Sequence, residues 1–88
     1  MGKKFTSKEY WDLVPEIEEL NETWKVENPG IVYWIQDYLK IYPIAEKIYK
    51  EKDFSLKDGT LALQKKTNCP PFVALEAYAL QGGFFVKE

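Results

Sequence analysis

Apolar side chains recur at every third or fourth residue through the first part of this chain, and this spacing constrains the fold more than any other feature. Thr6 and Glu9 stand just before the pattern at the spacing of a capping box, in which a hydroxyl and a carboxylate satisfy the first amides of a helix. We therefore expect a helix from Thr6 to about Lys25. Its apolar face would consist of Tyr10, Leu13, Val14, Ile17, Leu20 and Trp24.

A second apolar segment, residues 31–42, follows the turn Asn28-Pro29-Gly30. Its β-branched and aromatic start, Ile31 to Ile35, suits a strand as well as a helix. We favour a helix because the three-to-four spacing lasts for about twelve residues, more than the roughly five or six of a typical strand. The apolar pattern then continues to about Lys52.

Prolines interrupt both helical patterns. Proline removes one backbone hydrogen bond and crowds the carbonyl of the preceding turn, so we expect Pro15 and Pro43 each to kink or break a helix. Pro71 follows at the same interval along the chain. This spacing is either a faint internal repeat of kinked helices or a coincidence among five prolines.

The last third of the chain contains two shorter helical patterns. The polar stretch Asp53 to Gly59 is expected to be a loop, with Asp58-Gly59 as its turn. Leu61 to Thr67 and Phe72 to Gln81 are the expected helices, and Gly82-Gly83 ends the second one. The sequence therefore predicts a single all-α domain of residues 1–88, with tails at residues 1–5 and 82–88. Its architecture would be a small irregular bundle of four to five helices.

The composition excludes most catalytic chemistry, because the 88 residues include neither His nor Arg. His is the usual general base near neutral pH and the commonest ligand of transition metals, and Arg is the side chain that grips phosphate with two parallel hydrogen bonds. The chain also lacks a glycine-rich phosphate loop and a calcium loop. We expect no enzymatic activity, no metal site and no cofactor.

The charge balance argues against nucleic acid as the main partner. The net charge is −2, whereas proteins that coat nucleic acid or anionic lipid are usually basic. The alternative is that residues 60–81 form a helix-turn-helix of a DNA-binding regulator. Its recognition helix, residues 72–81, would carry one Glu and no Lys, Arg, Asn or Ser to read base edges.

A single cysteine, Cys69, cannot form an internal disulfide, which is typical of a protein from a reducing compartment. We therefore expect a cytoplasmic protein, and no apolar run approaches the roughly 20 residues that span a bilayer. Cys69 precedes a helix expected to open at Pro71, where the helix dipole lowers a thiol pKa. It is a candidate reactive thiol, and the other interpretation is a buried, inert side chain.

Aromatic residues give the positive indication of function. They make up 16% of the chain, and a domain of this size buries only about 60 to 65% of its unfolded surface. Some rings should therefore stay exposed, as they do at protein interfaces, although core filling is the competing interpretation. The sequence predicts a small protein-binding module, such as an adaptor, an inhibitor, an accessory subunit or a homodimer. The candidate contact residues are Tyr33, Trp34, Tyr38, Tyr42, Tyr49, Phe84 and Phe85.

Overall fold

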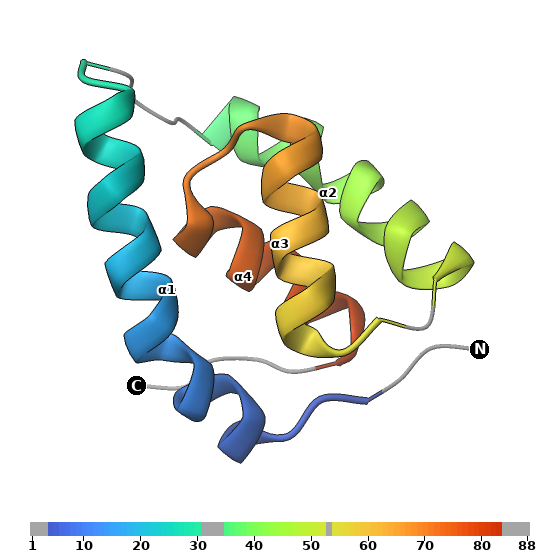
Figure 1. Cartoon of the computed structure of the whole chain (residues 1–88). Coiled ribbons are helices and arrows are strands. Elements are labelled where there is room, and N and C mark those ends of the chain that lie inside the picture. Colours follow the sequence, from blue (N-terminus) through green and yellow to red (C-terminus); the bar gives the residue numbers. More distant parts are fainter. Residues whose placement is uncertain (1–3, 31–34, 53, 84–88) are drawn as a thin grey trace.

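The computed structural model describes residues 4–30, 35–52 and 54–83. Within these residues it contains four α-helices and no strand, which confirms the all-α bundle (Figure 1). The helices are α1 (Ser7–Glu27), α2 (Ile35–Glu51), α3 (Leu56–Thr67) and α4 (Pro71–Gln81). Ile35 begins α2, and the choice between helix and strand for residues 31–34 lies outside the described residues.

The first helix begins as the capping box predicts. The Glu9 amide donates to Thr6 Oγ1 at 3.1 Å, and the Thr6 amide donates to Glu9 Oε1 at 3.2 Å. The apolar stripe then places four side chains in the interior, and Leu20 at the edge of this stripe stays 39% exposed. The four buried residues are Tyr10, Leu13, Ile17 and Trp24.

The two internal prolines do not break their helices. Pro15 lies inside α1 and Pro43 inside α2, and each helix continues as one element beyond its proline. A kink at either position stays a prediction. Pro71 is instead the first residue of α4, where the missing amide hydrogen has no helical partner to lose. The three evenly spaced prolines therefore occupy different helical positions, which does not support an internal repeat.

The start of α3 corrects the sequence prediction, which placed a loop over Asp53 to Gly59 and the helix start at Leu61. The helix begins at Leu56 because Ser55 caps it, its hydroxyl accepting from the Asp58 amide at 3.2 Å. The Asp58 carboxylate then lies in the first turn, where the helix dipole favours negative charge.

Gly59 is part of this helix and does not form a turn. It is buried, and a Cβ atom at this position would overlap the Tyr78 ring of α4. The absence of a side chain at Gly59 therefore lets α3 and α4 approach closely, and the chain does not change direction there.

The last helix, α4, is the centre of the fold and packs against α1, α2 and α3 (Figure 1). Much of it is buried, and several of the buried side chains are alanines, which let neighbouring helices approach closely. α1 and α3, by contrast, contact each other only loosely. The buried residues of α4 are Pro71, Ala74, Leu75, Ala77, Tyr78 and Ala79.

The beginning of α4 is anchored to α1. The Phe72 amide donates to Asn21 Oδ1 at 3.5 Å, so a side chain of α1 supplies an acceptor at the start of α4. Nearby, the buried Trp24 donates from Nε1 to the Asn68 carbonyl at 3.1 Å. These bonds fix the α3–α4 connection against the end of α1 and therefore fix which face of α4 remains outside.

Three aromatic rings close the opposite end of the core. Phe5 lies with its ring centroid 5.5 Å from that of Tyr78 and 6.0 Å from that of Tyr49, and the two tyrosine centroids are 5.9 Å apart. Phe5 belongs to residues 1–5, which the sequence assigned to a tail, yet it is 7% exposed. The segment before α1 thus contributes to the core.

Candidate functional site

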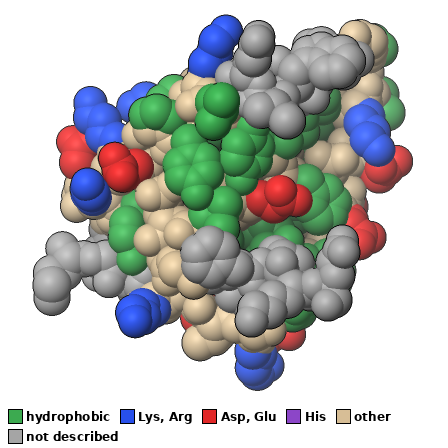
Figure 2. Space-filling model, turned by 180° about the vertical axis from the view of Figure 1, so that it is seen from behind, with side chains coloured by type: hydrophobic (Ala, Val, Ile, Leu, Met, Phe, Trp, Pro, Cys, Tyr) green, Lys and Arg blue, Asp and Glu red, His purple; other side chains and the backbone are tan. Residues whose placement is uncertain are grey.

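One acidic side chain, Glu76, lies on the part of α4 that its three neighbouring helices leave uncovered. The residue is exposed as a whole, but the surrounding side chains remove part of the water from its carboxylate, and this desolvation raises its pKa. Glu76 is the one acid in the otherwise apolar sequence of α4. Figure 2 shows the molecule from behind, where hydrophobic side chains form a broad surface.

Two tyrosines from different helices lie near this carboxylate. Burial raises the pKa of Tyr38 of α2 to about 12, and the negative charge of Glu76 contributes to that rise. The pKa of Tyr10 of α1 is raised in the same way, first by burial and then by the Glu76 charge. Because such an effect falls with distance, α1 and α2 each place a tyrosine within electrostatic range of Glu76.

Tyr42 extends this cluster along α2. Its ring centroid is 5.8 Å from that of Tyr38, one helical turn earlier, and both rings are half-buried. Leu39, three residues before Tyr42, is 61% exposed. We refer to Tyr10, Tyr38, Tyr42 and Glu76 as the Glu76 face.

The structure separates one of the other sequence-predicted contact residues, Tyr49, from this face. The half-buried Tyr49 packs its ring against Phe5 and Tyr78, so it contributes to the core cluster. Tyr33, Trp34, Phe84 and Phe85 lie outside the described residues. Of the predicted set, the structure therefore brings Tyr38 and Tyr42 together.

Two residues of interest were missed by the sequence reasoning. Trp11 lies off the apolar stripe of α1 and is 54% exposed, with its ring against Tyr10 at a centroid distance of 5.1 Å. From the sequence, Glu76 is only the one Glu of the recognition helix in the DNA-binding alternative. The available signal was its position as the single acid in the apolar sequence of α4.

Cys69 occupies a buried position just before α4. It is fully enclosed, and this burial raises the pKa of its thiol, whereas its hydrogen bond with Thr67 acts in the opposite direction with a smaller effect. Burial thus favours the neutral thiol and limits the access of reagents to it, while a reactive Cys69 stays an untested prediction.

The described residues contain no assembly suited to metal chemistry. Across residues 4–30, 35–52 and 54–83, no three acidic or cysteine side chains come together in a way that could hold an ion. In the same part of the chain, no helix is long and apolar enough to cross a membrane.

The helix-turn-helix alternative gains no support from the packing. The recognition helix would be α4, and α1, α2 and α3 each pack against that helix. A recognition helix must present one side to the major groove. Its uncovered side carries Glu76, whose charge repels phosphate.

Comparison of the chain with models of protein families, with curated proteins and with solved structures finds no match. The functional conclusion therefore depends on the geometry and electrostatics of this chain alone.

Proposed function

We propose that the protein is a small non-enzymatic binding module, an adaptor, inhibitor or accessory subunit, that binds another protein through the Glu76 face. The observation that carries the proposal is the half-buried pair Tyr38 and Tyr42, with ring centroids 5.8 Å apart, together with the one acid that the apolar helix α4 exposes. The raised pKa of Glu76, which follows from its partial burial, agrees with this arrangement. A tyrosine covers a large apolar area and loses few torsions when it binds, which suits it to interfaces.

The carboxylate defines the chemistry of the partner. A charge that has already lost part of its water gains more from an opposite charge than a fully hydrated one does. We therefore expect the partner to place a Lys or Arg against Glu76, with apolar side chains around it on Tyr38 and Tyr42. A second copy of this chain is one partner that would satisfy this description, since the chain contains twelve Lys.

A cytoplasmic location is part of this proposal. Its support is the single buried thiol, which has no second cysteine with which to form an internal disulfide.

Replacing the carboxylate should stabilise the isolated protein. Because the pKa of Glu76 is raised on folding, the folded chain binds this proton more tightly than the unfolded chain, and stability falls as pH rises through its titration. The glutamine side chain of the Glu76→Gln variant is neutral at every pH. We expect it to melt above the parent protein at pH 7, by roughly 1 to 4 °C given the exposure of the side chain. Thermal unfolding followed by circular dichroism measures this.

The difference should disappear at about pH 3.5, where the carboxyl of the parent protein is also neutral. The matched control is Glu18→Gln, which removes the same charge from an exposed position on α1. If Glu76→Gln melts no higher than Glu18→Gln at pH 7, Glu76 is an ordinary hydrated surface charge and the proposal loses this part of its support.

A further inference from the structure

A second surface lies between α1 and α3, on helices whose mutual contact is loose. Two cavities of about 280 Å³ and about 480 Å³ occur there, and both are lined by Leu13 and Lys57. They therefore adjoin, and we refer to them together as the α1–α3 groove. Glu76 and the tyrosines of its face line neither cavity.

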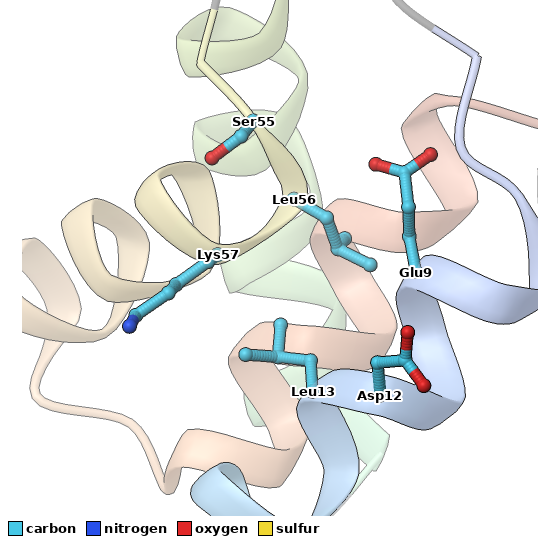
Figure 3. Close-up of a pocket in the computed structure, with 6 residues that line it drawn as sticks. All are labelled: Glu9, Asp12, Leu13, Ser55, Leu56 and Lys57. Atoms are coloured by element: carbon cyan, nitrogen blue, oxygen red, sulfur yellow. The ribbon is translucent and has the colours of Figure 1, made fainter.

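The floor of the groove is apolar and its rim on α1 is acidic. Figure 3 shows the smaller cavity, with Leu13 and Leu56 between the two helices, Glu9 and Asp12 on α1, and Lys57 on α3. The larger cavity continues this pattern along α1, with Ile17 and Leu20 as apolar residues and with Glu16 and Glu19 as acids.

A single ammonium group crosses the groove. Lys57 Nζ lies 2.9 Å from Glu16 Oε1, and both side chains are about half exposed. Asp12 is also paired on the outer side, with Lys8 at 2.9 Å. Exposed pairs of this kind contribute little stability and exchange partners readily. Four carboxylates and one ammonium group line the two cavities, so the groove is negative and can accept further cations.

The length of the groove fits one helix. Its lining on α1 extends from Glu9 to Thr23, which corresponds to about 21 Å at 1.5 Å per residue. A partner helix of about 14 residues covers this distance and would place apolar side chains on the floor at the three-to-four spacing.

We propose that the α1–α3 groove binds a basic amphipathic helix of another protein. Its apolar stripe would lie on Leu20 and Leu61, the two leucines of the larger cavity that are not buried, above the buried Leu13 and Ile17. Its Lys or Arg side chains would pair with the acids of α1 and replace Lys57 at the Glu16 carboxylate. The charge of the groove opposes nucleic acid and acidic peptides as occupants.

A designed peptide tests this without knowledge of the natural partner. The probe is a fluorescent amphipathic helix of about 14 residues made of Leu and Lys, and its counterpart carries Glu in place of Lys. We expect the Lys peptide, and not the Glu peptide, to bind the full chain in fluorescence anisotropy. Lys57→Ala should tighten binding about threefold or more, because it removes the competing cation from the groove.

Charge reversal within and outside the groove gives the decisive comparison. Glu16→Lys with Glu19→Lys should weaken binding about tenfold or more. Glu18→Lys with Glu27→Lys changes the net charge of the same helix equally, at exposed positions that line neither cavity, and should weaken it less than about threefold. Circular dichroism verifies that both double variants keep the helical fold.

Two outcomes would overturn the inference. Equal weakening by the two double variants would mean that the peptide is attracted by overall charge and has no defined site. Loss of peptide binding in Glu76→Lys, with no loss in the Glu16→Lys and Glu19→Lys variant, would place the peptide on the Glu76 face. The second result contradicts the groove as the site and leaves the proposed function intact.

Discussion

Gly59→Ala is expected to destabilise the protein by about 3 kcal/mol, toward the upper end of the cost of overpacking a core. Helix propensity alone predicts the opposite sign, because alanine is favoured over glycine inside a helix by about 1 kcal/mol. The overlap with Tyr78 decides the result, since the ring is fully buried and must shift within the core to admit a Cβ atom. Urea denaturation followed by far-ultraviolet circular dichroism measures the change.

The Tyr78→Leu background shows whether the ring is the cause. With the ring removed, Gly59→Ala should cost less than about 1 kcal/mol or become favourable, as helix propensity predicts. An equal loss in both backgrounds would mean that Gly59 is required for a reason other than its contact with Tyr78.

Phe5→Ala is expected to cost about 3 to 4 kcal/mol, although Phe5 precedes the first helix. The substitution removes a buried ring that packs against both Tyr49 and Tyr78 and leaves a cavity at the end of the core. Because domains of this size are only marginally stable, such a loss would remove much of the free energy of unfolding. The midpoint of urea denaturation reports it.

Trp11→Ala is the matched control, because it deletes a larger aromatic side chain that is 54% exposed. We expect it to cost less than about 1 kcal/mol. If Trp11→Ala destabilises the protein as much as Phe5→Ala does, the contribution of Phe5 cannot be attributed to its burial.

The sequence predicts helices well where the signals are local. The capping box of Thr6 and Glu9 and the apolar spacing behind it correctly locate α1, and the glycines after Gln81 correctly locate the end of α4. At α3 the reasoning failed because Asp58-Gly59 has the composition of a turn. The reason for this glycine is the Tyr78 ring, which is distant in sequence and which local patterns do not report.

The candidate site was less predictable than the fold. The aromatic content indicated an interface but could not separate Tyr42, in the cluster with Tyr38, from Tyr49, which packs on the core. That distinction depends on where Phe5 lies. Glu76 could not be assigned from its own segment either, because the burial that raises its pKa depends on how α4 packs with the rest of the fold.

The proposed role of Glu76 implies a compromise between stability and binding. A partly desolvated carboxylate destabilises the isolated chain at neutral pH, and a partner cation would reverse that effect. Glu76→Gln should therefore make the chain more stable and a weaker binder. A purely structural role would not couple these two changes in opposite directions.

The most direct test of the Glu76 face compares three forms of the full chain as immobilised baits in an extract of the native host. The forms are the parent protein, Glu76→Lys and the control Glu18→Lys, which reverses an exposed charge on α1. We expect quantitative mass spectrometry to find a partner protein captured by the parent and by the control, and to find about tenfold or more less of it on Glu76→Lys. Light scattering of the purified chain shows whether that partner is a second copy. Equal retention by all three forms would contradict the Glu76 face as the binding site.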